Sequence, residues 1–186
     1  AVRKATKEFD TRLSAFISQL SDLHNGAFDD STSKSRDNCQ SVIYLKAVAL
    51  LEQFVPPRLP PQVYFHRLVQ SGEELLTARE YDLACNECFK RFLRTPESKR
   101  GLIPETESAR LECIALDFRA NAGIIMCQFF MAVEHDSELR RSSTADEVLC
   151  QLDALRELVE KSAIGNQPDL YWLVYNSTVQ IFTLCT

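Results

Sequence analysis

The chain has 186 residues, a formal net charge of −5 and a hydrophobic content of 45%. This length allows one well-packed core or several stacked helical hairpins. The acidic balance argues against general nucleic-acid binding, which needs a basic face to displace counterions. With only five glycines, the composition also favours long helices over a turn-rich β fold.

Apolar residues at helical spacing predict two helices in the first third of the chain. The first runs from about residue 3 to residue 24, and a polar loop over residues 29–37 follows it. The second runs from about residue 38 to residue 54. The apolar stripe of the first consists of Phe9, Leu13, Phe16, Ile17, Leu20 and Leu23. That of the second consists of Val42, Leu45, Val48 or Ala49, and Phe54. Residues 56–61 (Pro-Pro-Arg-Leu-Pro-Pro) should form a stiff, extended connector, because proline cannot continue a helix.

Residues 65–98 have the spacing of one tetratricopeptide-like helical hairpin. Counted from Phe65 as position 1, the small residues Gly72 and Ala84 fall at positions 8 and 20, and Tyr81 falls at the turn. We expect the small residues to let two antiparallel helices approach closely, while Tyr81 fills the turn between them. Four positions depart from the pattern, namely Ser71, Arg79, Cys88 and Arg91.

Three further helices are predicted after the hairpin. A long one over about residues 105–133 follows a polar loop, and because it is apolar on most sides we expect it to be sandwiched between neighbours. A charged linker over residues 134–143 precedes Thr144, which forms a predicted capping box with Glu147 at the start of the sixth helix. Pro168 opens the seventh helix.

These elements predict an all-α fold without strands. We interpret residues 1–186 as a single helical-repeat domain, in which antiparallel helical hairpins form a tetratricopeptide-like α-solenoid array. The last helix is apolar over most of its circumference, so part of it should remain exposed and mark an interaction site. Trp172 and Phe182 are the candidate partner-binding residues there, and the chain is expected to be a fragment of a longer protein.

No catalytic, cofactor or metal site is predicted. Cys85-x-x-Cys88 has the spacing of a zinc-ligand pair, but the sequence offers no second Cys pair or His-x-x-x-His to complete four ligands. The three histidines have no ligand spacing, and no Gly-x-Ser-x-Gly or glycine-rich phosphate loop is present. The seven cysteines lie mostly in apolar helical stretches, which indicates reduced, buried thiols of an intracellular protein.

One cluster of basic residues has two interpretations. It consists of Lys90, Arg91, Arg94, Lys99 and Arg100. The cations can simply stabilise the carboxyl end of a helix while they remain solvated. They can also contact an acidic surface of a partner protein.

Three blocks of sequence carry a resemblance to a known family. They are Pro57-Arg58-Leu59-Pro60 shortly before Tyr64, Glu80-Tyr81-Asp82-Leu83-Ala84, and the helix from Leu170 to Thr183 with Tyr171-Trp172-Leu173-Val174-Tyr175-Asn176. Together they resemble the amino-terminal region of the cilia- and flagella-associated protein 54 family over about residues 40–186. The related cilia- and flagella-associated protein 46 family has a similar Leu-Val-Tyr-Asn helix.

The resemblance implies a very large, non-enzymatic helical protein of the cytoskeleton, in the axoneme of motile cilia and flagella. It implies a scaffold in the projections of the central-pair microtubules, needed for ciliary assembly and beating. Implied partners are other central-apparatus proteins, with calmodulin in the same complex and microtubules nearby, but no nucleic acid or membrane. These residues contain no Ile-Gln motif to contact calmodulin. The alternative function is a tetratricopeptide-type adaptor whose groove binds a short peptide segment of a partner.

Overall fold

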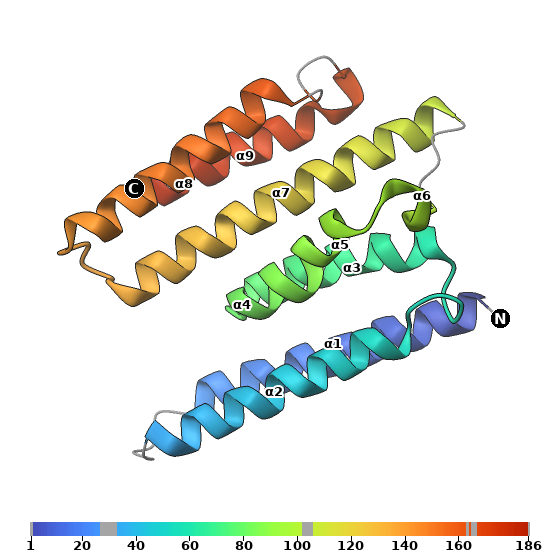
Figure 1. The fold of residues 1–186 in the computed structure, drawn as a ribbon, viewed down its shortest axis with the longest axis horizontal. Helices are drawn as coiled ribbons and strands as arrows, with labels where there is room; N and C mark the ends of the chain where they lie inside the picture. Colours follow the sequence, from blue (N-terminus) through green and yellow to red (C-terminus); the bar gives the residue numbers. More distant parts are fainter. Residues whose placement is uncertain (1, 27–32, 102–105, 163, 165–166, 186) are drawn as a thin grey trace.

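A computed structural model describes residues 2–26, 33–101, 106–162, 164 and 167–185 of the chain. All regular elements in these residues are helical, which confirms the all-α prediction (Figure 1). Figure 1 shows them in successive layers, with the first two helices at one end and the last two at the other. The longer helices are α1 (Val2–Gly26), α2 (Ser33–Gln53), α3 (Pro61–Thr77), α7 (Glu107–His135), α8 (Ser142–Lys161) and α9 (Tyr171–Cys185). The shorter elements are α4 (Tyr81–Leu83), the π-helix Ala84–Phe89, α5 (Lys90–Arg94), α6 (Glu97–Arg100) and the 3-10 turn Pro168–Leu170.

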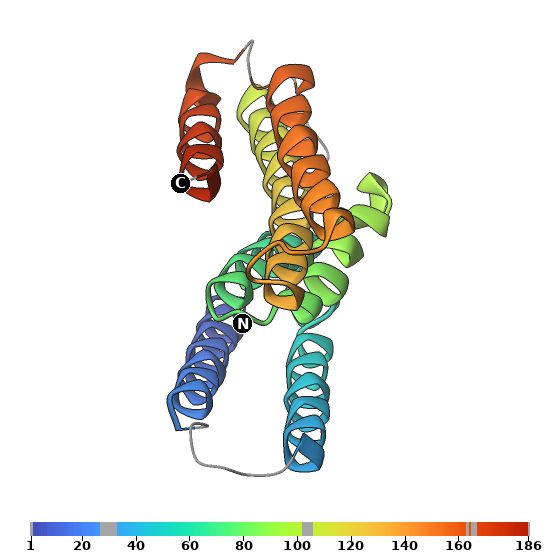
Figure 2. The same ribbon diagram turned by 90° about the vertical axis from the view of Figure 1, so that its left-hand side faces the viewer.

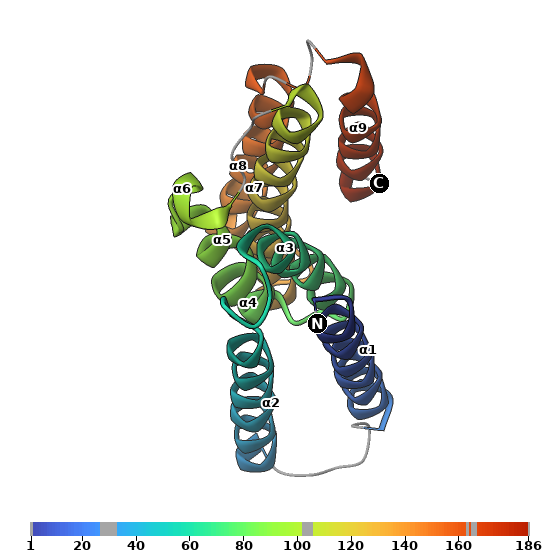
Figure 3. The ribbon, with the colours of Figure 1, turned by 90° about the vertical axis from the view of Figure 1, so that its right-hand side faces the viewer.

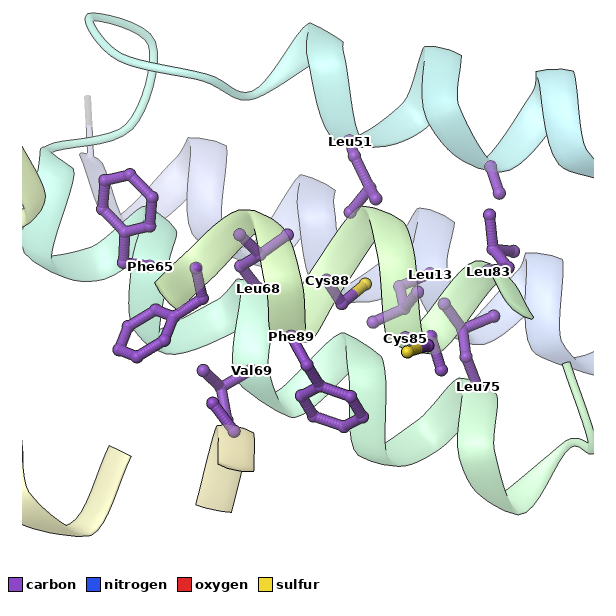
Figure 4. Packing of buried hydrophobic residues seen from close by; sticks show 14 of the residues in the cluster. Leu13, Leu51, Phe65, Leu68, Val69, Leu75, Leu83, Cys85, Cys88 and Phe89 are labelled. Carbon is purple, nitrogen blue, oxygen red and sulfur yellow. The ribbon is translucent and has the colours of Figure 1, made fainter. Parts of the chain in front are cut away.

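The predicted stripe of α1 is confirmed, whereas the stripe predicted for the second helix is wrong at Val42 and Leu45 and correct at Phe54. Phe9, Leu13, Phe16 and Leu20 of α1 are buried. The side chain of Leu23 lies outside the described part of the chain. Among the α2 side chains that the structure describes, Ala47 and Leu51 are buried, as is Phe54 just after the helix, whereas Val42 and Leu45 are 49% and 67% exposed. This helix has apolar residues on two faces, and the buried face is the one that meets the hairpin, where Leu51 packs in the same cluster as Cys88 (Figure 4). The helix also begins at Ser33, so residues 33–37 are not a loop.

The proline-rich connector is folded into turns rather than extended. The backbone N–H of Arg58 donates to the carbonyl of Val55 at 3.0 Å. The Arg58 guanidinium lies over the ring of Phe54, 4.3 Å from its centroid. Phe54 and Leu59 are both fully buried. The connector bends because the side chains of Phe54 and Leu59 are both buried in the core. Proline is compatible with turns, so the backbone can fold in this way.

The hairpin of residues 65–98 begins with α3 and turns at a left-handed residue. Proline at the first helical position suits the start of α3, since its missing N–H would be unsatisfied there in any case. At the end of α3, Arg79 has φ of +63°. The N–H of Arg79 donates to Leu76 and that of Glu80 donates to Leu75, at 3.1 and 2.9 Å. This pair of bonds is a Schellman motif, in which glycine is the preferred residue at the left-handed position.

Arg79→Gly is therefore expected to stabilise the protein, by about 0.5–1 kcal/mol. Glycine adopts positive φ without the steric cost that arginine has there, and Arg79 is exposed with no ion pair to lose among those the structure describes. Chemical denaturation followed by circular dichroism measures the difference. Thr77→Gly, two residues earlier and inside the helix, is the matched control and should destabilise.

The second half of the hairpin is not a uniform α-helix. Residues 84–89 form the short π-helix, called the π-turn below, in which the N–H of Lys90 donates to the carbonyl of Cys85. Gly72 of α3 faces this turn, because a Cβ atom built at Gly72 would lie only 3.0 Å from that of Cys88. Gly72 thus marks a close approach of the two helices, as predicted, and Ala84 is fully buried. Tyr81 is buried too, with its ring stacked on Phe130 at 5.3 Å.

α7 is sandwiched, as its sequence predicts. One side packs on the hairpin and the other on α8 and α9. Figure 1 shows α7 between the hairpin and α8, and Figures 2 and 3 show α1 and α9 on one side of the molecule and α2 and α8 on the other. Among the described helices, α7 is the one long and apolar enough to span a membrane by length and composition. Core helices have the same composition, and α7 also carries Arg119 in an ion pair with Glu73 of α3 at 2.5 Å.

The predicted capping box at Thr144 is wrong. α8 begins two residues earlier, at Ser142, and Thr144 is buried inside its first turn. The carboxylate of Asp136 accepts the backbone N–H groups of Arg140 and Arg141 at 3.2 and 2.8 Å. These hydrogen bonds, first that of Arg141, lower the pKa of Asp136. The carboxylate next to the start of α8 is therefore that of Asp136, in the loop before the helix. The capping-box pattern pairs the N-cap residue with the residue three positions later, so it does not include Asp136.

Candidate interaction surfaces

The structure does not gather the five predicted basic residues on one surface. Arg100, the last residue of α6, is only 6% exposed. Its guanidinium donates to the backbone carbonyls of Thr95 and Leu93 at 2.6 and 3.0 Å, and to Asp117 of α7 at 2.7 Å. It also lies over the ring of Phe92 at 4.3 Å. Arg100 therefore holds the end of the hairpin onto α7, and the prediction of a solvated cation is wrong for this residue.

Two other members of the basic cluster have partners within the chain. Arg91 forms an ion pair with Glu52 of α2 at 2.7 Å and lies 6.0 Å from the ring centroid of Tyr64. The ammonium of Lys90 donates to the side-chain oxygen of Asn86 at 3.0 Å. Arg94 and Lys99 are exposed. For these two, contact with an acidic partner stays a prediction.

The second predicted surface is an exposed apolar stripe on α9. Trp172, Tyr175, Val179 and Phe182 are exposed by 51%, 69%, 45% and 71%. On the other side of the helix, Leu173 and Ser177 are buried. The helix itself carries no charged residue. Trp172 and Phe182 thus lie on the outer side of α9, together with two residues that the prediction did not name, Tyr175 and Val179.

A groove of about 140 Å³ lies between α3, α7 and α9. Its lining includes Leu76, Phe118, Ala122, Met126, Gln180 and Trp172, which lies at the edge between this groove and the outer side of α9. At one side, the guanidinium of Arg119 donates two hydrogen bonds to the carboxylate of Glu73, at 2.7 and 2.5 Å. Sequence reasoning missed this groove because its walls come from three helices far apart in the chain, and no local spacing connects them.

Arg67 of α3 binds a neighbouring helix. Arg67 donates to Asp10 of α1 at 3.1 Å and to Gln70 at 2.5 Å. His66 is half-buried, and this burial lowers its pKa. In the adaptor interpretation such a side chain would face a peptide, but Arg67 instead binds α3 to α1.

The lowered pKa of His66 predicts a loss of stability in mild acid. The unfolded chain binds the proton more readily, with a pKa of about 6.5, so stability is fully present above that pH and falls as the pH drops through the folded pKa. Urea denaturation at pH 7.5 and 5.5 measures this loss. In His66→Gln the loss over this range should be smaller, and an unchanged pH dependence would contradict the assignment.

The five cysteines whose side chains the structure describes are free thiols, and three of them are buried. Cys85, Cys88 and Cys127 are at most 1% exposed, Cys113 is half-buried and Cys150 is exposed. Burial raises the pKa of Cys88. A hydrogen bond between Cys85 and Cys127 lowers the pKa of Cys85 and raises that of Cys127. Within the described residues, no group of three His, Cys, Asp or Glu side chains is placed to hold a metal ion.

Thiol labelling under native conditions should therefore separate the cysteines by exposure. Cys150 should react rapidly, while Cys85, Cys88 and Cys127 react only when the core opens. Peptide mapping by mass spectrometry after timed alkylation measures each rate. If Cys85 reacts as fast as Cys150, its thiolate is accessible and the interpretation as an inert core residue fails.

Comparison with known proteins identifies the family. The family model described as cilia- and flagella-associated protein 54 matches residues 44–186. The chain belongs to this family. The human and mouse proteins named cilia- and flagella-associated protein 54 are 28% identical to it over 141 and 144 residues, each match covering 69% of the chain. The Chlamydomonas reinhardtii protein of the same name is 29% identical over 127 residues, or 67% of the chain. No solved structure matches.

The family match confirms the predicted resemblance and defines its extent. It begins at Tyr44, in the middle of α2, and includes the hairpin, α7, α8 and α9. The hydroxyl of Tyr44 donates a hydrogen bond to Glu87 in the π-turn, which joins the start of the matched region to the hairpin. The chain spans about 4% of the length of the curated cilia- and flagella-associated protein 54 relatives.

Proposed function

We propose that this chain is a non-enzymatic scaffold segment of the motile-cilium axoneme, within a projection of the central-pair microtubules, and is needed for assembly and beating of cilia and flagella. The observation that carries the proposal is the family match over residues 44–186. The relatives are named for cilia and flagella, which supports a location in the axoneme.

The fold supports a scaffold role. Helices pack in successive layers, and the hairpin of α3, α4 and α5 is covered by α1 and α2 on one side and by α7 on the other. A tetratricopeptide-like array of such hairpins would give an extended rod with long faces for neighbouring subunits. The partners in this proposal are other central-apparatus proteins, with calmodulin in the same complex and microtubules nearby.

Deletion of the matching segment in the Chlamydomonas relative tests this function. Without it, we expect axoneme cross-sections to lack density at one central-pair projection, and flagella to beat abnormally. Immunoblotting must show that the shortened protein persists and enters the flagella. Reintroduction of the segment should restore the density. Normal projections and normal beating in cells that contain the shortened protein would contradict the proposal.

A peptide-binding adaptor is the second candidate, because of the groove between α3, α7 and α9. Trp172 is the only tryptophan of the chain and lines this groove, so a bound peptide should change its fluorescence. Display of short random peptides would supply the probe. Saturable binding that changes the fluorescence and is lost in Met126→Lys would favour the adaptor. Absence of any selected peptide would favour the scaffold.

A further inference from the structure

α9 has apolar side chains on two sides. On the inner side, Leu173 packs in one cluster with Phe118 and Met126 of α7 and Leu155 of α8. On the outer side, Trp172 and Tyr175 are exposed by 51% and 69%. Val179 and Phe182 also make contacts within the chain, and their exposed fractions of 45% and 71% are what remains after those contacts.

The outer residues follow the spacing of a helix-packing seam. Steps of three, four and three residues separate Trp172, Tyr175, Val179 and Phe182. Alternating steps of three and four keep apolar side chains on one stripe, where they pack into the gaps of a facing helix. Scattered exposed apolar residues are common on protein surfaces, but four large ones in one helical register form a contiguous stripe.

Within the same molecule, α7 shows how such a helix is accommodated. It too is apolar on more than one side, and one side contacts the hairpin while the other contacts α8 and α9. α9 is more apolar than α7 and, unlike α7, carries no charged residue. By composition it is an interior helix, although only its inner side is buried in this chain.

We propose that the outer stripe of α9 is covered by an amphipathic helix of the same polypeptide in the full-length protein. The curated relatives are far longer, since the chain spans about 4% of them, so such a polypeptide has ample sequence to supply this helix. Because Asn176, Thr178 and Gln180 beside the stripe are uncharged, the covering helix carries apolar residues at the same spacing and neutral polar residues on its flanks. This proposal rests on the helical-array part of the proposed function and not on the axonemal location.

Cysteine labelling at the stripe tests the proposal in the full-length protein. Tyr175→Cys is introduced into both the 186-residue chain and the natural full-length polypeptide, and alkylation is followed by peptide mapping. The new thiol should react at least about tenfold more slowly in the longer polypeptide, because the covering helix must first open. Cys150, which is exposed on α8, is the internal control and should react equally in both.

A second variant separates coverage from misfolding. Tyr175→Lys should leave the melting temperature of the 186-residue chain unchanged, since the side chain is 69% exposed, and should lower that of the longer polypeptide. Equal labelling of Tyr175→Cys in both polypeptides would overturn the proposal. Protection in the 186-residue chain that grows with its concentration would overturn it too, because a second copy would then be the occupant. None of these outcomes depends on where the protein is located in the cell.

Discussion

Phe89→Ala is expected to lower the free energy of unfolding by about 3–5 kcal/mol, the largest effect of any single substitution considered for this protein. The side chain is fully buried in the largest core cluster, at the end of the π-turn. It occupies a slot between two glycines. A Cβ atom built at Gly72 of α3 would lie 2.6 Å from the ring, and one at Gly123 of α7 would lie 2.4 Å from it. The ring therefore fills the junction of three helices, and its removal leaves a cavity that the backbones cannot close without moving.

Urea denaturation followed by helical circular dichroism measures the loss. Tyr175→Ala, an aromatic truncation at a side chain that is 69% exposed, is the control and should change stability by no more than about 0.5 kcal/mol. A similar small change for Phe89→Ala would mean that this ring is not part of the packed core.

The two glycines provide a test of the slot itself. Gly123→Ala should be destabilising alone, because overpacking costs about 1–3 kcal/mol and exceeds the helix-propensity gain of about 1 kcal/mol. In the Phe89→Ala background the ring is gone, so Gly123→Ala should become neutral or stabilising. This reversal of sign is specific to a direct clash, and additive effects would contradict it.

The spacing of apolar residues predicted the helices well, but it predicted the buried face correctly only where a helix is apolar on one side. The stripe of α1 was correct because its sequence is apolar on one side only, from Phe9 to Leu20. The stripe predicted for α2 was wrong at Val42 and Leu45 because the sequence is apolar on two sides, and only the position of the hairpin selects the face with Leu51. The π-turn was not predicted either, since its sequence has no local signal that differs from an α-helix.

The same holds for the candidate surfaces, where a feature carried by one helix could be predicted and a contact between helices could not. The exposed stripe of α9 could be predicted because one helix carries all of it, and the excess of apolar residues is visible in the sequence. The role of Arg100 could not be predicted, since Asp117 lies on another helix and the two acceptor carbonyls are backbone groups. A basic cluster in sequence therefore did not mean a basic cluster in space.

Arg100→Ala is the second substitution expected to have a large effect, a loss of about 2–4 kcal/mol in the free energy of unfolding. Two part-buried backbone carbonyls would lose charged donors, each worth about 1.5–3 kcal/mol, although water can partly replace them. The ion pair with Asp117 adds less, because that side chain is 40% exposed and screened by solvent. Asp117→Asn should accordingly cost only about 0.5–1 kcal/mol.

Arg100→Lys distinguishes charge from geometry. Lysine keeps the charge but lacks the planar fork that reaches Thr95, Leu93 and Asp117 together, so most of the loss should remain. Full recovery by lysine would show that Arg100 acts as a charge alone.

The neighbouring exposed cations are the matched controls. Lys99→Ala and Arg94→Ala should each change stability by no more than about 0.5 kcal/mol. A loss in Lys99→Ala equal to that in Arg100→Ala would contradict the special role of Arg100. If the controls behave as expected, these two variants alone in the cluster can test contact with an acidic partner, since a loss of binding in either could not be attributed to a damaged fold. Arg100 holds α6 against α7, so a loss of binding in Arg100→Ala would not separate the two causes.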